Sequence, residues 1–429
     1  MAIFSFLLLS IRKAGALAMA VGLIVITVPL GLAASSGPSQ VMQACSPSLQ
    51  NPVINNSMPF FINSSTGRFF AYGYSYYQPF VMRNRTGYTM WLTVEHQNSS
   101  LVTQGIYTAN SADGVHWAIN PSPLLTNGAK GSWDSGTVYS PWVVWNGTMY
   151  LMYFTGVNST VTSRSIGVAF SRDNVHWTEY PGNPIVKGGP GAYDAYWARF
   201  PSVIYENGTY KMWYTGHTLI TSKGLNVTID YATSADGIHW AKYASNPVLK
   251  VYYSSGFYFS ERGSVIRVGG GYVMTWDDEQ NISYAYSSDG ITWTGGPYPL
   301  LRSPASGAWS NNSVIFSDPL LNGSELLLLY SGEGAPKQQY SYTPYTGGIG
   351  LAYCPMVIVQ TVDSTTILRT TTFVSTATVV SVSATTFQTT AQEVVGSSDL
   401  PYYQASLVGL GAVAVVLAVL AMRGRRPGP

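Results

Sequence analysis

The sequence predicts an all-β fold, a five-bladed β-propeller, from a repeated motif and from the turns that separate its strands. The motif, Ser-x-Asp-(Gly/Asn)-x-(His/Thr)-Trp, occurs four times, at 111–117, 171–177, 234–240 and 287–293. Its tryptophans recur at intervals of 60, 63 and 53 residues. A period of this size, built from strand-like segments, is typical of propeller blades, with six blades as the alternative count.

Each repeat contains the same series of four short strands. In the third copy, an aromatic-rich strand at 196–204 is followed by an Asn-Gly turn and a second apolar strand at 210–216. A third strand at 229–234 leads into the Ser-x-Asp-Gly turn, and a short strand at 246–249 ends the unit. Because Asn-Gly and Asp-Gly pairs adopt the positive φ angles that tight hairpins need, we expect antiparallel strands, four to a blade.

The two ends of the repeat region supply the fifth blade. Residues 347–354 match the third-strand pattern, and residues 51–54 match the missing fourth strand. Cys354 takes the Ser position of the motif, Cys45 takes its Trp position, and the sequence has no other cysteine. We therefore expect a disulfide between Cys45 and Cys354 that closes the ring and adds several kcal/mol at most. The alternative is a pair of buried free thiols.

Composition favours one large domain in an exported protein. The 429 residues are 46% hydrophobic and only 10% charged, against about 25% in an ordinary soluble domain. The net charge of +2 gives no reason to expect a nucleic-acid partner. Eleven Asn-x-Ser/Thr sequons predict a glycoprotein in which glycans replace charge on the surface. Alternatively, the sequons arise by chance because Asn, Ser and Thr are common in turns.

Both ends of the sequence predict contact with a membrane. Residues 1–34 predict a signal peptide or, alternatively, an uncleaved anchor. The uncharged segment 405–422 predicts a transmembrane helix, and the basic tail at 423–429 predicts that this end is cytoplasmic. Residues 357–398, rich in Ser and Thr, predict an extended stalk or, alternatively, a strand. We therefore expect a single-pass protein at the cell surface with its propeller outside.

The repeat pattern resembles that of the five-bladed propeller glycoside hydrolases of the arabinanase and β-fructosidase type, and of the related mannoside phosphorylases. The resemblance covers about residues 45–356 and depends on the series Pro-Ser-Val-Ile, Asn-Gly, Tyr-x-Met-Trp-Tyr-Thr-Gly, the Asp turn and Asn-Pro-Val-Leu. It implies a carbohydrate pocket at the propeller axis, on the rim where innermost strands begin. It also implies three carboxylates from successive blades, because glycosidic cleavage needs an acid and an opposing base or nucleophile.

Only one of the family's acidic positions is kept in this sequence. The positions before Pro or its equivalent are Gln78, Ser140, Phe200, Arg262 and Asn311, and none is Asp. Arg199-Phe200-Pro201 matches the family's Arg-Asp-Pro triplet apart from its Asp, and Ser140-Pro141 stands where Asp-Pro is expected. Glu261 matches the general acid, so the resemblance implies that Glu261 is catalytic.

Other acidic residues are candidates for the catalytic partner of Glu261. Two of them lie six residues before Ser140 and Phe200, where innermost strands are entered, and the others end second strands, which run back to the same rim. The candidates are Asp134, Asp194, Asp277, Asp278, Glu95 and Glu333. The alternative is that Asp134 and Asp194 only cap loops through their own backbone.

Substrate contacts are expected from charged, aromatic and polar side chains beside the axis. Guanidinium groups suit a carboxylate or a hydroxyl-rich ligand, and aromatic rings stack on sugar faces. The substrate-binding candidates are Gln78, Ser140, Trp197, Arg199, Arg262 and Asp277. Alternatively, Arg199 and Arg262 pair with Glu261 and only fill the channel.

The repeated motif itself is expected to be structural. Its aspartates, which serve turns around the ring, are Asp113, Asp173, Asp236 and Asp289. Its histidines share one position on different blades and cannot converge on a metal ion, so we expect no metal and no cofactor.

These observations predict a membrane-anchored, extracellular, glycosidase-like protein that acts on polysaccharide or oligosaccharide at the propeller axis. One alternative is a glycan-binding or adhesion protein that has lost the catalytic Asp residues. Another is a structural cell-envelope protein whose axis is plugged by aromatic side chains.

Overall fold

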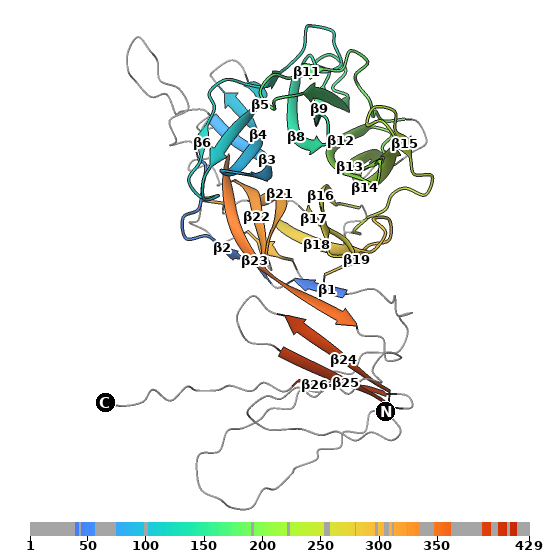
Figure 1. Cartoon of the computed structure of the whole chain (residues 1–429). Helices are drawn as coiled ribbons and strands as arrows, with labels where there is room; N and C mark the ends of the chain where they lie inside the picture. Colours follow the sequence, from blue (N-terminus) through green and yellow to red (C-terminus); the bar gives the residue numbers. More distant parts are fainter. Residues whose placement is uncertain are drawn as a thin grey trace, which may run out of the picture. The chain divides into compact units, whose positions relative to one another are not determined.

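Five antiparallel sheets surround one central axis in a computed structural model of the protein (Figure 1). The predicted five-bladed propeller is therefore confirmed, and the alternative count of six blades is wrong. The structure describes residues 39–42, 44–55, 74–97, 102–189, 193–220, 224–252, 258–278, 280–296, 299–303, 309–310, 313–323, 325–333, 347–361, 388–395, 402–409 and 412–417.

Each blade pairs strands that follow one another in the sequence. The first blade consists of β3 (Tyr74–Asn84), β4 (Gly87–Gln97), β5 (Val102–Ser111), β6 (Ala118–Ile119) and β7 (Leu125–Thr126). The second consists of β8 (Thr137–Trp145), β9 (Tyr150–Val157), β10 (Arg164–Ser171) and β11 (Thr178–Glu179). The third consists of β12 (Trp197–Glu206), β13 (Thr209–Ile220), β14 (Gly224–Ser234) and β15 (Ala241–Lys242). The fourth consists of β16 (Glu261–Val268), β17 (Gly271–Asp277), β18 (Asn281–Ser287), β19 (Thr294–Gly295) and β20 (Leu301–Arg302).

The fifth blade joins the two ends of the domain, as predicted. It consists of β21 (Ser313–Asn322), β22 (Glu325–Glu333), β23 (Gly347–Thr361), β2 (Ser46–Pro47) and β1 (Ser39–Met42). Both N-terminal strands pair with β23, and Ile54 forms a further bridge with Ile349. A disulfide links Cys45 to Cys354, which are 309 residues apart. The predicted disulfide is thus confirmed, and it joins the first and last segments of the ring.

A two-residue turn connects the first and second strands of the third blade. Asn207 and Gly208, with φ angles of 50° and 75°, lie in the left-handed region and connect the paired residues Glu206 and Thr209. These angles match a tight hairpin turn whose twist fits antiparallel strands. The Asn-Gly signal in the sequence therefore identified a real hairpin.

A β-bulge interrupts every innermost strand at an equivalent position. The bulged residues, with φ angles between 46° and 56°, are Gln78, Ser140, Phe200, Arg262 and Phe316. Each N–H donates a hydrogen bond of 2.9–3.1 Å to a side-chain oxygen on the second strand of the preceding blade. In the same order, the acceptors are Ser331, Thr93, Thr155, Thr215 and Asp277. One buried bond beside the axis therefore ties every blade to its neighbour.

The equivalent position in the fifth blade is Phe316, so the predicted position, Asn311, was wrong. The prediction aligned residues 313–315, Ser-Val-Ile, with Ser-Val-Ile triplets that follow the bulge in other blades. In the structure this triplet precedes the bulge and Asp318 follows it. Because backbone pairing sets a bulge, a matching triplet of side chains does not fix its place. Asn311 itself lies outside the described residues.

The C-terminal part of the protein forms a separate compact unit. Its described strands pair in the order β24 (Gln388–Val395), β25 (Tyr402–Gly409) and β26 (Ala412–Leu417). The strand β24 falls within the predicted stalk, 357–398, β25 begins just before the predicted transmembrane segment, 405–422, and β26 lies within it, so the structure does not show the predicted helix. Within the described ranges, no helix is long and apolar enough to span a membrane. The predicted signal segment, 1–34, and basic tail, 423–429, lie outside the described residues.

Replacing Thr155 by Val is expected to lower the free energy of unfolding by about 1–3 kcal/mol, because the buried N–H of Phe200 loses its acceptor. Denaturant unfolding of the full-length protein measures this change. Thr178→Val, at an exposed residue of the same blade, is the matched control and should change the free energy by less than about 0.5 kcal/mol. Equal effects of the two substitutions would contradict a role for the inter-blade bond.

Replacing Cys45 and Cys354 together by Ala is expected to destabilise the propeller by about 4 kcal/mol, because the bond closes a loop of 309 residues. The measurement is the melting temperature of both proteins with and without a thiol reductant. Reductant should lower the melting temperature of the wild type and leave that of the double variant unchanged. A wild type that is insensitive to complete reduction would show that strand pairing alone closes the ring.

Candidate functional site

An ion pair between two neighbouring blades defines the candidate site. Arg199 lies on β12 of the third blade and Glu261 on β16 of the fourth, each immediately before the bulged residue of its strand. Arg199 Nη2 donates to Glu261 Oε1, and Arg199 Nε donates to His217 Nε2 at 2.9 Å. His217 Nε2 lies 3.7 Å from Glu261 Oε1. The three side chains therefore meet on the rim where innermost strands begin.

Burial and charge set the protonation of this group. Glu261 is 7% exposed, and burial alone would raise its pKa. The charge of Arg199 together with His217 and Arg164 outweighs burial and holds the pKa of Glu261 below its usual range. Burial lowers the pKa of His217 to about 4. At neutral pH, Glu261 is therefore a carboxylate and His217 is neutral, with its proton on Nδ1 because Nε2 accepts from Arg199.

Aromatic side chains and a second arginine lie beside the ion pair. The guanidinium of Arg164, at the start of β10, lies 3.9 Å from the ring centroid of Trp197. The rings of Tyr196 and Trp197 are 4.5 Å apart, and Tyr196 is 44% exposed. Trp197 also lies 5.1 Å from the His217 ring. These rings present apolar surface of the kind on which a sugar ring stacks.

The axis is closed at the level of the bulges. Phe200 and Phe316 lie 5.2 Å apart, and Arg262 Nη2 donates to the carbonyl of Pro79 at 2.7 Å. Burial lowers the pKa of Arg262 to about 10, against the opposing effects of Asp318 and Asp277. Arg262 is 3% exposed, so it fills the channel, but its hydrogen bonds go to the carbonyls of Pro79 and Phe316 and not to Glu261, the partner that the alternative expected.

The two other polar candidates on the innermost strands are also buried at this level. Thr93 Oγ1 donates to Gln78 Oε1 at 2.7 Å, and the backbone N–H of Ser140 donates to the same Thr93 oxygen. Both side chains are less than 10% exposed. Gln78 and Ser140 therefore contribute to the closed floor beneath the ion pair.

Of the predicted acidic partners of Glu261, Asp277 lies opposite it on the next strand, whereas the others bond to groups elsewhere in their own blades. Asp277 is the residue opposite Glu261 in the pairing of β16 with β17, and its Oδ2 accepts the N–H of Phe316 at 3.1 Å. Asp134 accepts from Ser132 at 2.6 Å and raises the pKa of Glu179, which burial brings to about 7.

Asp194 and Asp278 have partners of their own. Asp194 accepts from the hydroxyl of Tyr214 at 2.9 Å and also from Lys242. Asp278 accepts the N–H of Asn281 at 2.7 Å, in a tight turn. Within the described residues, none of Asp134, Asp194 and Asp278 contacts Glu261. Asp277 is thus the candidate that strand pairing brings nearest to it.

His217 and Arg164 belong to the site but were not among the predicted residues. A weak signal existed for His217, because its register position on the second strand is that of Glu95 and Glu333, which the sequence did single out. Arg164 gave no signal, because its contact with Trp197 joins two blades and depends on how the loop before β10 turns.

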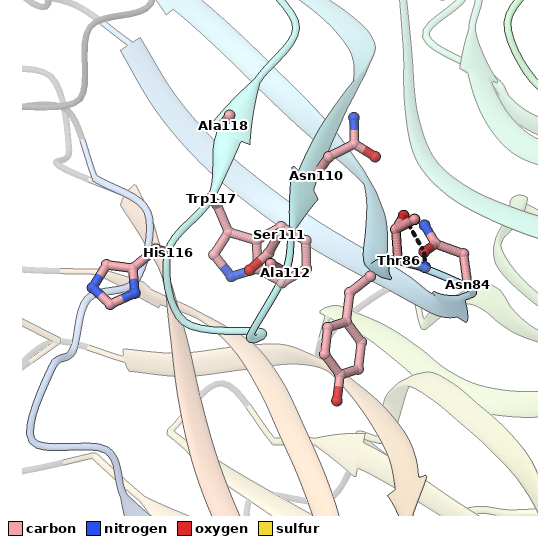
Figure 2. A pocket seen from close by; sticks show the side chains of 9 residues that line it. Asn84, Thr86, Asn110, Ser111, Ala112, His116, Trp117 and Ala118 are labelled. Atoms are coloured by element: carbon pink, nitrogen blue, oxygen red, sulfur yellow. Dashed lines mark hydrogen bonds between the residues drawn. The ribbon is translucent and has the colours of Figure 1, made fainter.

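A surface pocket of about 460 Å³ lies beside the first Ser-x-Asp turn (Figure 2). Its lining comes only from the first blade, includes no acidic residue, and contains Thr86 bonded to Asn84. In the adjoining turn, Asp113 Oδ1 accepts the N–H groups of Val115 and His116 at 2.8 Å. The same bonds recur at the other three turns, so the predicted structural role of the motif is confirmed.

Two curated proteins of Mycobacterium tuberculosis are similar to this protein, whereas no protein-family model matches it. "Uncharacterized protein Rv1502" of strain ATCC 25618 / H37Rv is 32% identical over 228 residues, which cover 50% of this sequence and 74% of the relative. "Uncharacterized protein MT1551" of strain CDC 1551 / Oshkosh matches to the same extent. This protein belongs to the family of these mycobacterial proteins.

Solved structures of five-bladed propeller glycoside hydrolases share the fold. "Zg3597, a family 117 glycoside hydrolase" from Zobellia galactanivorans aligns with a TM-score of 0.53 at 13% identity, over 75% of this protein and 91% of the other. A BT0996 complex with RGII aligns with a TM-score of 0.54 at 15% identity, over 65% and 87%. A structure from the GH130 family, which contains glycoside hydrolases that target β-1,2 mannosidic linkages in Candida mannan, aligns at 0.50 with 16% identity, over 75% and 95%. The resemblance predicted from the repeats is confirmed for the fold.

His217→Gln is expected to remove a pH-dependent loss of stability. The pKa of His217 is lowered to about 4, so between about pH 6.5 and pH 4 the unfolded state binds a proton that the folded state does not. As the pH falls through this window, the wild type should therefore lose about 1.4 kcal/mol more stability per pH unit than His217→Gln. Denaturant unfolding at pH 7 and pH 4.5 measures the loss, with exposed His116→Gln as the control. Identical pH slopes in the wild type and in His217→Gln would exclude this protonation effect.

Proposed function

We propose that this is a glycosidase-like protein that acts on a polysaccharide or oligosaccharide at the axial rim. The observation that carries the proposal is Glu261, a buried carboxylate on the rim with Arg199 and His217 on one side and the rings of Trp197 and Tyr196 nearby. The shared fold with glycoside hydrolases supports the same class of substrate.

The protonation of Glu261 determines its proposed role. Glycosidic cleavage requires a proton for the leaving oxygen and a base or nucleophile on the other side of the sugar. Because Glu261 is ionised in the free protein, it suits the role of the base or the nucleophile. A ligand that draws Arg199 away leaves burial as the main influence, which raises the pKa of Glu261 toward that of an acid. Asp277, opposite Glu261 in the strand pairing, is the proposed second carboxylate.

A second candidate function is glycan binding without turnover. The Arg199–Glu261 ion pair favours it, because a carboxylate that is already paired is less available for chemistry. Under this candidate the same rim would hold the sugar, and the protein would serve in adhesion or recognition.

The cellular setting is part of the proposal. The signal-like segment 1–34, the uncharged segment 405–422 and the eleven sequons support an exported glycoprotein anchored at the cell surface. A carbohydrate-active propeller with this topology would meet polysaccharide outside the cell.

Glu261→Gln is expected to lower turnover by about 10²–10⁴-fold, because it removes the charge and keeps the size of the side chain. The test incubates the full-length protein with arabinans, fructans, mannosides and xylo-oligosaccharides and measures the sugar released. Glu325→Gln, at the start of β22 in the fifth blade, is the control and should keep full activity. Turnover that survives in Glu261→Gln would refute the catalytic assignment, whereas binding without turnover in the wild type would favour the second candidate.

A further inference from the structure

Of the three arginines around the axis, one guanidinium has neither an ion pair nor a hydrogen bond within the described residues. Arg199 is paired with Glu261, and Arg262 donates to the carbonyls of Pro79 and Phe316. For Arg164, no ion pair or side-chain hydrogen bond is found within the part of the protein that the structure describes. Its Nε is buried without a partner, and the residue as a whole is half-buried. Within the described residues, no direct ion pair or hydrogen bond therefore neutralises the charge of Arg164.

Arg164 lies beside the ion pair of the rim site. Its guanidinium stacks on Trp197 at 3.9 Å, so the indole ring covers one face, and no hydrogen bond from the guanidinium edge is found within the described residues. Arg164 also interacts electrostatically with Glu261, Arg199 and Tyr139, and burial lowers its pKa. It thus belongs to the rim site and lies within the electrostatic range of the ion pair.

Other polar groups at the same place also lack partners. The hydroxyl of Tyr139 and Nδ1 of His217 are buried without a hydrogen-bond partner in the described residues. Buried polar atoms are nearly always paired, so several unpaired atoms in one location point to a polar ligand. With His217 neutral, Glu261 is bonded to Arg199, and within the described residues no carboxylate is bonded to Arg164.

We infer that the rim site takes a carbohydrate bearing a carboxylate, a uronic acid, and that Arg164 binds that carboxylate. The inference rests on the proposed function, since it names the class of sugar bound at the same site. A planar guanidinium matches a carboxylate with two parallel hydrogen bonds. The exposed face of Tyr196 then lies beside the sugar ring. A neutral sugar would leave the half-buried charge unpaired, which selects against it.

The test compares matched methyl glycosides that differ only in the carboxylate. Calorimetric titration of the full-length protein uses the pairs glucuronate and glucose, galacturonate and galactose, and mannuronate and mannose. We expect at least one uronate to bind at least about tenfold more tightly than its neutral partner, the effect of one charge-assisted pair. Arg164→Met, which keeps the apolar stem against Trp197, should abolish this preference. Arg172→Met, at an exposed arginine, should keep it.

Three further measurements test for misfolding, for the need of a planar guanidinium and for the electrostatic origin of the preference. Arg164→Lys keeps the charge without the planar fork and should retain only part of the preference, and the thermal melt of each variant reports folding. The preference should also shrink in about 1 M NaCl. Equal binding within every pair, an unchanged preference in a folded Arg164→Met, or no uronate binding at all would overturn the inference.

The titration measures binding and does not require turnover, so the inference can fail while the proposed function holds, and the reverse. Uronate-selective binding in a protein that releases no sugar would remove the catalytic proposal and leave the role of Arg164 intact. Hydrolysis of neutral glycans with no uronate preference would do the reverse. If the protein bound a sulfated sugar and none of the uronates, the assignment of a carboxylate as the ligand of Arg164 would be refuted.

Discussion

The hydrogen bond from each bulged innermost-strand residue to the preceding blade is the interaction on which the rest of the structure depends. It holds a non-glycine residue in the left-handed region, at a cost on the order of 1 kcal/mol, and it satisfies an N–H buried beside the axis. Because the bond recurs in all five blades, the residue before the bulge has the same place on every innermost strand. Arg199 and Glu261 occupy that position on neighbouring blades, so backbone geometry brings the ion pair together.

In the fourth blade, the acceptor of this inter-blade hydrogen bond is a charged side chain. Four acceptors are hydroxyl groups, whereas the acceptor for Phe316 is the carboxylate of Asp277. Asp277 and Asp318 supply negative charge near Arg262, so burial lowers the pKa of Arg262 only to about 10 and the side chain stays cationic. Arg262 in the closed floor of the axis therefore has two aspartates within electrostatic range. On the rim above it, no acidic side chain forms an ion pair with Arg164 within the described residues.

Local chemistry explains how much of the fold was predictable. Asn-Gly turns, the Ser-x-Asp motif and the two cysteines act through short-range geometry or a single possible pairing, and each was read correctly. The site was less predictable because its contacts join different blades. Arg164 meets Trp197 through a loop whose path no local pattern encodes, and Asp134 and Asp194 found partners within their own blades. The prediction misplaced the fifth bulge because residues 313–315 repeat the Ser-Val-Ile triplet of other blades but precede the bulge instead of following it.

The two arginines at the rim connect ligand charge to the protonation of Glu261. Both lower its pKa, while burial acts to raise it. A ligand carboxylate on Arg164 would cancel part of the positive charge that keeps Glu261 ionised. The pKa of Glu261 would then rise toward the value that burial alone favours. A uronate would thus do more than occupy the site, because its own charge would help Glu261 to acquire the proton that glycosidic cleavage requires. A neutral sugar has no such effect, so one unpaired arginine would contribute to both selectivity and reactivity.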